Sequence, residues 1–301
     1  GGLISAAGSF WCAEATSFTE FNLARVVAGA GAGIILTTGQ IVLADDLPEL
    51  TGPVEITGPG ADKLTIDRAP AVAPFHAFRT SKDLTLTGLA ITHGNDPGNG
   101  GAISSTGGDL TLKDVVVTDS HAYYGKGGAL YVDGGSATIE DSQFAGNVAV
   151  TGAGAWISNA DSVSISDSTF ISNSAQYFFA GPNLDPNTGG GLRIEDAAKV
   201  EISGSVIKDN SSYTDGAAFS ISNAGEASIS SSFVADNATE FIESQPGYEY
   251  FGTARIIAGQ TTITNSQFTG NFSGSFLAGL QIIGPATISG SVIANNSSGG
   301  P

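Results

Sequence analysis

The chain has 301 residues, of which 42 are glycine, and only 13% of its residues are charged. Its hydrophobic content of 41% is enough for a large core and excludes a disordered chain. A net charge of −18 argues against nucleic acid and anionic membranes as partners, and no apolar run reaches the roughly 18 residues of a membrane-spanning helix.

Residues 1–33 are predicted to form an N-terminal cap with a short helix. Ser17 can cap this helix because Glu20 follows at the capping-box position. We expect the helix to cover the first coil of a repeat domain at 34–301, since the ends of a solenoid need protection. Cys12 is the only cysteine, so no disulfide can form within the chain.

A motif of nine residues recurs through the repeat domain, with isoleucine first, serine fourth, a large apolar residue sixth and asparagine ninth. Its copies begin about 26 residues apart, and segments of the type Gly-Gly-Ala-apolar lie between them. Short runs of alternating polar and apolar residues, such as Ser162–Ser166, predict β-strands. A coil of this length has room for three short strands and three turns. The sequence therefore predicts an all-β fold, a single-stranded right-handed parallel β-helix of about ten rungs.

The asparagine at the ninth motif position is predicted to be structural. Coils in register would stack these residues into a ladder at one turn, where asparagine tolerates a left-handed backbone and its amide can bond to the next coil. The ladder comprises Asn147, Asn173, Asn210, Asn237, Asn271 and Asn296. The last four of these fall in glycosylation sequons, which we interpret as chance because no glycan fits an inward position.

Two coils are longer than the others, with inserts near 176–188 and 240–251. Aromatic residues occupy these inserts and the same slot of shorter coils, so we predict an aromatic flank along one side that binds glycans or a partner surface. The alternative is that the inserts fold back and cover the coil. The flank comprises Tyr123, Tyr124, Tyr177, Phe178, Phe179, Tyr213, Tyr248, Tyr250 and Phe251.

No catalytic constellation is predicted. Neighbouring carboxylates such as Glu140 and Asp141 should point to opposite faces of a strand. The run from His93 to Asp96, with His121 one coil later, is the most polar cluster, and we interpret it as solvated turn residues. Turns such as the one at Asp96 could hold Ca²⁺, but no nonapeptide calcium repeat is present, so no metal or other cofactor is predicted.

The pairing of Gly-Gly-Ala-apolar with Phe-x-x-Asn, as in Phe144–Asn147 and Phe170–Asn173, resembles the repeats of polymorphic outer membrane proteins. Residues 58–67 and 84–89 are similar to secreted β-helix proteins with an N-terminal CSLREA-type domain. These resemblances imply an exported surface or adhesin-like protein, and they supply no catalytic residues.

The predicted function is a non-catalytic extracellular structural or adhesin-like surface protein with a glycan or cell-surface partner. The alternative is a carbohydrate-active β-helix enzyme, either a polysaccharide lyase or a glycoside hydrolase. No capping device follows Asn296, so we expect self-association by coil stacking at that end, up to filaments, unless a further domain follows. Since the first residue is glycine, we expect an exported chain whose leader was removed, or else a trimmed one.

Overall fold

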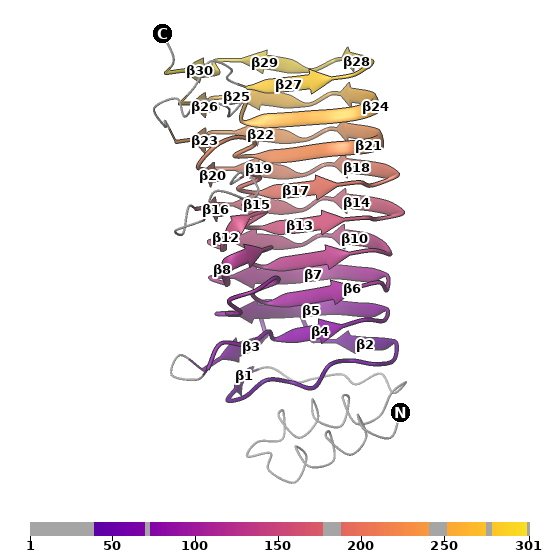
Figure 1. The fold of residues 1–301 in the computed structure, drawn as a ribbon, viewed down its shortest axis with the longest axis vertical. Coiled ribbons are helices and arrows are strands. Elements are labelled where there is room, and N and C mark those ends of the chain that lie inside the picture. Colours follow the sequence, from indigo (N-terminus) through magenta and orange to yellow (C-terminus); the bar gives the residue numbers. More distant parts are fainter. Residues whose placement is uncertain (1–38, 70–72, 177–187, 241–251, 275–278, 300–301) are drawn as a thin grey trace.

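The computed structural model describes residues 39–69, 73–176, 188–240, 252–274 and 279–299. Within these residues the chain is all-β, and its coils stack into a rod (Figure 1). The strands of successive coils pair in parallel and in register. The predicted cap at 1–33 lies outside the described residues, as do most of both predicted inserts.

The strands form four columns along the rod, one more than the three strands per coil that were predicted. Column A contains β4 (Phe78–Thr80), β6 (Ile103–Thr106), β9 (Leu130–Asp133), β13 (Ala155–Ser158), β17 (Leu192–Glu195), the starts of β21 (Phe219–Ser230) and β24 (Ala254–Thr264), and β27 (Leu280–Ile283). Column B contains β2 (Val54–Thr57), the starts of β5 (Leu84–Thr92) and β7 (Leu110–Thr118), β10 (Ser136–Glu140), β14 (Ser162–Ser166), β18 (Lys199–Ser203), the ends of β21 and β24, and β28 (Ala286–Ser289).

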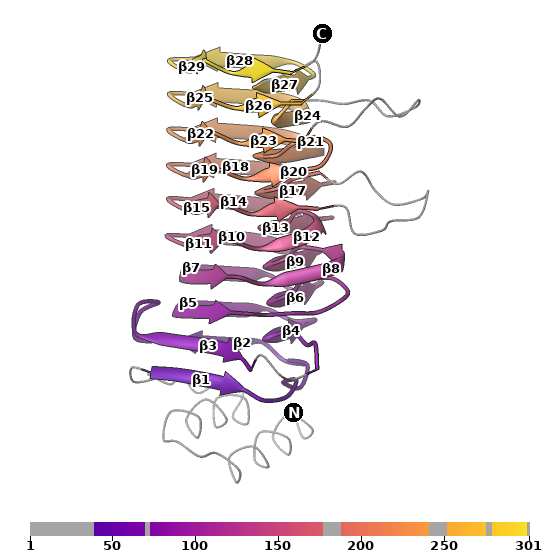
Figure 2. The same ribbon diagram turned by 90° about the vertical axis from the view of Figure 1, so that its left-hand side faces the viewer.

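Column C contains β1 (Gly39–Leu43), β3 (Leu64–Arg68), the ends of β5 and β7, β11 (Gln143–Ala145), β15 (Thr169–Ile171), β19 (Val206–Lys208), β22 (Phe233–Ala235), β25 (Gln267–Thr269) and β29 (Val292–Ala294). Column D, on the side labelled β8 and β12 in Figure 2, contains β8 (His121–Lys126), β12 (Val148–Thr151), β16 (Ser174–Ala175), β20 (Ser211–Ser212), β23 (Ala238–Thr239), β26 (Phe272–Ser273) and β30 (Ser297–Ser298). The described residues therefore make about 9 turns, close to the ten rungs predicted.

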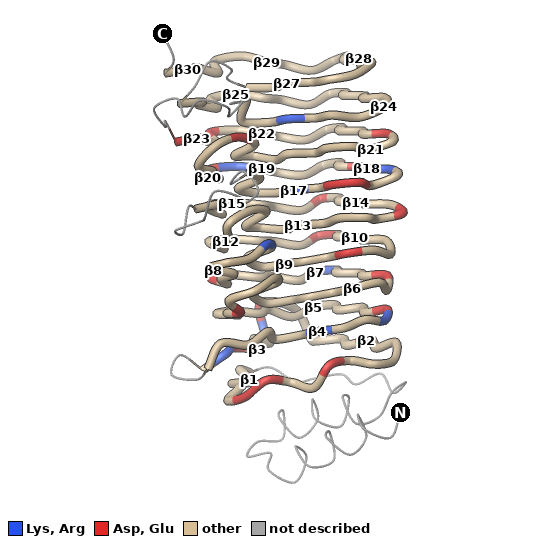
Figure 3. Tube along the Cα trace, viewed as in Figure 1, with Lys and Arg blue, Asp and Glu red and all other residues tan. Residues whose placement is uncertain are grey.

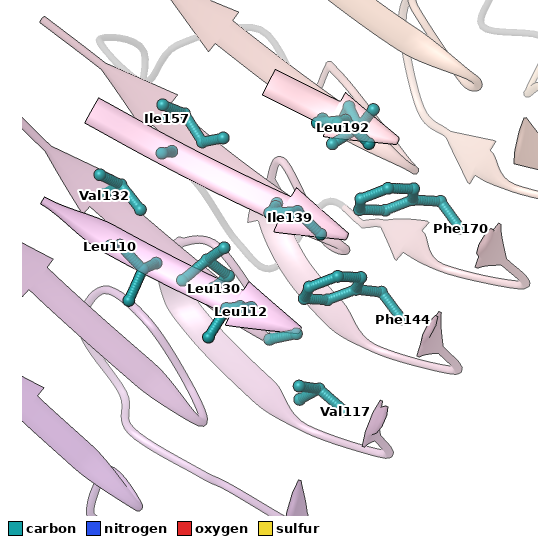
Figure 4. Packing of buried hydrophobic residues seen from close by; sticks show 14 of the residues in the cluster. Leu110, Leu112, Val117, Leu130, Val132, Ile139, Phe144, Ile157, Phe170 and Leu192 are labelled. Carbon is teal, nitrogen blue, oxygen red and sulfur yellow. The ribbon is translucent and has the colours of Figure 1, made fainter. Parts of the chain in front are cut away.

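The core is a stack of like side chains, as the repeat predicted. In column C, Phe144 pairs with Phe170, and their rings stack with centroids 4.7 Å apart. In column B, Ile139 pairs with Ile165, and both are buried. Figure 4 shows Ile139, Phe144 and Phe170 pointing into the same interior from neighbouring coils. The in-register pairing on which the repeat analysis depends is thus confirmed.

The corner between columns C and D holds the six asparagines of the ladder. Asn147 shows the pattern: its Nδ2 donates to Asn173 Oδ1 in the next coil (2.9 Å) and to the carbonyl of Val117 in the previous coil (3.1 Å). Its Oδ1 accepts the backbone N–H of Ser120 (3.0 Å). The left-handed backbone at this corner falls on the residue before each asparagine, with φ between 53° and 68°, and not on the asparagine itself.

The corner between columns B and C holds a second ladder, made of the serines at the fourth motif position. Ser168 Oγ accepts the backbone N–H of Ser142 (3.1 Å) and donates to the carbonyl of Ser166 (2.7 Å). The same two bonds recur at Ser205. The residue before each serine again has positive φ, between 48° and 61°. The sequence motif therefore encodes two sharp corners, each with a left-handed residue followed by a buried polar side chain.

Candidate functional site

Of the predicted aromatic flank, the structure describes Tyr123, Tyr124 and Tyr213, and the other six residues lie outside the described residues. Tyr123 and Tyr124 lie in β8, where the register with β12 shifts, and Tyr124 is 73% exposed. Tyr123 stacks on His121 with ring centroids 5.1 Å apart. Tyr213 follows β20, which is separated from β8 by β12 and β16. Of these three described tyrosines, the structure thus brings Tyr123 and Tyr124 together.

The polar cluster around His93 forms an interconnected network. His93 Nδ1 lies 2.8 Å from Asp67 Oδ1, and Arg68 Nε donates to the carbonyl of His93 (2.7 Å). Burial lowers the pKa of His121, with further lowering by the charges of His93 and Arg68 and an opposing effect of Asp119. The side chains here bind one another across neighbouring coils, which gives this cluster a structural role at the first turns of the rod.

Neither a metal site nor a membrane-spanning helix is found in the described ranges. Among these residues, no group of three or more His, Cys, Asp or Glu side chains is placed to hold a metal ion. The same part of the chain contains no helix of the length and hydrophobicity needed to cross a membrane.

A row of outward-facing residues on column A has a different character, and it was not predicted. It is formed by the second residue of each strand, which stands beside its counterparts in the neighbouring coils. We call it the arginine–aromatic row: Arg79, Ser104, Tyr131, Trp156, Arg193, Ser220, Arg255 and Gln281. Three of the five arginines of the chain belong to this row.

The Gly-Gly-Ala-apolar segments place this row. Gly127, Gly152, Gly189 and Gly216 turn the chain into column A with φ between 60° and 71°, which favours glycine. A Cβ on Gly152 would lie 2.7 Å from the Cβ of Trp156. The glycine turn therefore lies close to the outward side chain and determines which residue of each coil belongs to the row.

The middle of the row carries an aromatic stack. The rings of Tyr131 and Trp156 are nearly parallel, with an interplanar angle of 7° and centroids 4.8 Å apart. Lys126 Nζ lies over the Trp156 ring, 4.3 Å from its centroid, in a cation–π contact. Burial, followed by the charge of Asp133, raises the pKa of the Tyr131 hydroxyl. Trp156 is only 5% exposed, and its Nε1 has no hydrogen-bond partner among the described residues.

The next coils carry ion pairs. Arg193 binds Glu195 through Nε (2.6 Å) and through Nη2, and its Nη1 donates to Ser220 Oγ. Arg255 Nη1 lies 3.3 Å from Asp215 Oδ2. Burial raises the pKa of Asp215, and the positive charges of Arg255 and Arg193 oppose this shift. Asp215 is 3% exposed, and its Oδ1 has no partner within the described ranges.

The chemical groups of this row suit a polar ligand that also has flat apolar surfaces, although Trp156, Asp215 and Ser220 are at most 5% exposed. Aromatic faces pack against apolar patches, while guanidinium and carboxylate groups bond to hydroxyl groups. The sequence contained a signal for this row. The residue that follows the apolar residue of Gly-Gly-Ala-apolar must point outward, because side chains alternate between the two faces of a strand. That position holds Tyr131, Trp156 and Arg193, whereas the predicted flank was taken from the turns and inserts.

The comparisons with known proteins support the architecture. A family model described as a right handed beta helix region matches residues 77–301, well over half of the chain. No curated protein and no solved structure matches the chain. The handedness predicted from the sequence is in agreement with this match, and the chain belongs to the family of right-handed β-helix proteins.

Proposed function

We propose that the chain is a non-catalytic extracellular surface protein of the adhesin type that binds saccharides through the arginine–aromatic row. The observation that carries this proposal is the stacked pair Tyr131–Trp156, which lies on the same face as the Arg193–Glu195 ion pair. The resemblance of the repeats to those of exported surface proteins supports the extracellular location. The acidic segments distributed along the rod in Figure 3 suit a solvated surface.

The experiment measures binding and turnover together. The protein is titrated with neutral oligosaccharides and with oligogalacturonates, and binding is followed by calorimetry. Released reducing ends and unsaturated products are measured in the same mixtures. We expect binding without turnover and a loss of binding in Tyr131→Ala. The Tyr124→Ala variant serves as the matched control, because Tyr124 is exposed on column D. Loss of binding in Tyr124→Ala alone would instead favour the aromatic flank.

The second candidate function is a carbohydrate-active enzyme, and Asp215 is the observation that favours it. A buried carboxyl with a raised pKa can act as a general acid, and Glu195, which is paired with Arg193, would be the second carboxyl group of such a site. Turnover in the titration above that disappears in Asp215→Asn would establish this candidate in place of the non-catalytic one.

Self-association remains a further proposal. The coil formed by β27 to β30 exposes Ile288 and Ile293, whereas their register partners in the preceding coil, Ile263 and Phe268, are buried. We propose that this coil stacks on a second copy of the chain. Light scattering over a range of concentrations should show growth of the assembly, and Ile288→Lys should prevent it. A monomer at every concentration would contradict the proposal.

A further inference from the structure

The turn that follows β5 contains the dipeptide Asp96–Pro97, at the end of the polar run that begins at His93. We infer that the folded chain cleaves its own peptide bond between Asp96 and Pro97. The Asp96 carboxylate is the nucleophile, and His76 supplies a proton to the leaving nitrogen. This processing step goes beyond the proposed function and does not depend on it.

The next coil holds this turn on both sides of the bond. The backbone N–H of Asp96 donates to the carbonyl of His121 (3.1 Å), and the carbonyl of Pro97 accepts the backbone N–H of Tyr124 (3.1 Å). Pro97 itself is exposed, so water reaches the bond. The fold therefore presents the Asp96–Pro97 bond at the surface in one fixed conformation.

The Asp96 carboxylate lies alongside this bond. Its Oδ1 accepts the backbone N–H of Gly98 (2.7 Å), two residues further along the chain. An oxygen that makes this contact must lie beside the Asp96–Pro97 bond, because the bond is part of the short backbone segment that the contact closes. A Cβ on Gly98 would lie 3.0 Å from this oxygen, so the glycine leaves room for the carboxylate. A nucleophile held next to its target avoids much of the entropic cost of the reaction.

His76 is the acid of the proposed reaction. It is 8% exposed, and its two ring nitrogens face different groups. Nδ1 lies 2.6 Å from the carbonyl oxygen of Gly100, which can only accept, so Nδ1 carries a proton. Nε2 lies 3.4 Å from Asp96 Oδ2 and carries the second proton when the ring is charged. This second proton is therefore held beside the bond that breaks.

The reaction consumes only water. A carboxylate oxygen of Asp96 bonds to the main-chain carbonyl carbon of the same residue, which closes a cyclic anhydride. The bond from that carbon to the Pro97 nitrogen breaks, and the nitrogen takes the electron pair and the Nε2 proton of His76. Water then opens the anhydride, and the two protons released return to His76 and to the new amine of Pro97. Proline suits this step because its nitrogen belongs to a tertiary amide and carries no hydrogen in the chain.

Cleavage would leave the rod assembled. The two products are residues 1–96 and 97–301. Strands β4 and β5 lie in the first product and pair with β6 and β7 in the second, in parallel and in register. The products should therefore stay together in native solution and separate only when the chain is denatured.

The test incubates the full chain at about pH 6, close to the range in which histidines gain a proton. Samples taken over several days are denatured, and mass spectrometry measures the products that end at Asp96 and begin at Pro97. A second bond of the same type, Asp185–Pro186, lies outside the described residues and is the internal reference for the intrinsic lability of this dipeptide. The same incubation in concentrated urea removes the fold.

We expect the folded chain to break after Asp96 at least about tenfold faster than after Asp185, and the two rates to agree within about twofold in urea. Asp96→Glu keeps a carboxylate but requires a larger ring, so it should stop the cleavage. Circular dichroism and native size exclusion verify that the variant is folded and that the cleaved rod stays assembled. Pro97→Ala tests the same step in a variant that keeps Asp96, and it should slow the cleavage.

His76→Gln tests the proton donor. Glutamine can still donate to the carbonyl of Gly100 but has no acidic proton, so cleavage should be at least about tenfold slower. The matched control is His93→Gln, which changes another histidine of the same region, bonded to Asp67 at 2.8 Å, and should leave the rate unchanged.

Four results would overturn the inference. The first is a chain that remains intact throughout the incubation, and the second is equal rates at the two Asp–Pro bonds of the folded chain. Cleavage retained in a folded Asp96→Glu variant would exclude the carboxylate as the nucleophile. Equal rates in His76→Gln and His93→Gln would exclude His76 as the acid.

Discussion

The asparagine corner and the arginine–aromatic row are built on the same coils but follow opposite rules. At the corner, six successive coils carry the same side chain, and the five amides from Asn147 to Asn271 each bond to the coil before and the coil after. Along the row, residues change from tyrosine to tryptophan to arginine to serine, although their backbones are equally in register.

This difference shows how a repeat protein keeps the residues that stabilise its coils apart from the residues that can contact a ligand. A side chain whose partners are its own copies must repeat, because each coil completes the hydrogen bonds of the next. A side chain that faces outward on column A has no such requirement and can be adapted to a ligand. We therefore expect substitutions at the corners to change stability most, and substitutions in the row to change binding most.

The largest effect is expected for Asn210→Ala. Asn210 Oδ1 accepts from the backbone N–H and the Nδ2 of Asn173, and its Nδ2 donates to the carbonyl of Phe170 and to Asn237 Oδ1. Removing the amide leaves several buried groups unsatisfied, at about 1–3 kcal/mol each before relaxation. The free energy of unfolding should fall by about 3–4 kcal/mol, measured by urea denaturation.

The matched control is Gln143→Ala on β11, which is exposed and lies two coils before Asn210. It should change the free energy of unfolding by no more than about 0.5 kcal/mol. An Asn210→Ala variant as stable as this control would show that the hydrogen bonds of the corner do not hold the coils together.

A smaller effect is expected for Ser205→Ala at the other corner. Ser205 Oγ accepts the backbone N–H of Ser168 and donates to the carbonyl of Ser203, so its loss leaves one buried N–H without an acceptor. We expect destabilisation by about 1–2 kcal/mol. Ser228→Ala, on the partly exposed face of β21, is the comparison, and equal denaturation midpoints for the two variants would contradict the serine ladder.

The corners were only partly predictable from the sequence. The repeat identified Asn210 and its equivalents, because a fixed residue at a fixed interval in a solenoid must stack. The serine ladder was missed although serine recurs just as regularly, since serine is common throughout this chain. The left-handed backbone conformation was predicted at the asparagine. The structure has it one position earlier, at Asp209, where the chain turns before the amide points inward.

The row was missed for a different reason. Trp156 and Arg193 occupy equivalent positions but share no residue type, so a search for repeated residues does not connect them. Only the strand register connects these two residues. The contact of Trp156 with Lys126 and that of Arg193 with Glu195 depend on side-chain conformations that no motif specifies. Aromatic residues in turns and inserts, such as Tyr124, were more conspicuous in the sequence.

In the row, replacing both members of an ion pair should destabilise the chain less than replacing one of them. Arg193→Gln alone leaves the mostly buried Glu195 without its partner, and we expect it to destabilise the chain by about 1–2 kcal/mol. The double variant Arg193→Gln/Glu195→Gln removes both charges and should cost no more than about 1 kcal/mol. Thermal melts of the unmodified chain and the two variants measure this, and a double variant that is less stable than Arg193→Gln would mean that the pair is not coupled.

The smallest effect concerns the pH dependence set by His121 in β8, which lies outside both the corner and the row. Its folded-state pKa is lowered from 6.5, chiefly by burial, so the unfolded chain binds more protons between the two values. Stability should therefore fall as the pH falls from 6.5 through the lowered pKa, and the contribution is fully present only above 6.5. His121→Phe keeps a ring beside Tyr123 but cannot titrate, so its stability should depend less on pH in this window. Parallel denaturation curves for the two proteins across the window would mean that the surroundings of His121 do not disfavour its charge.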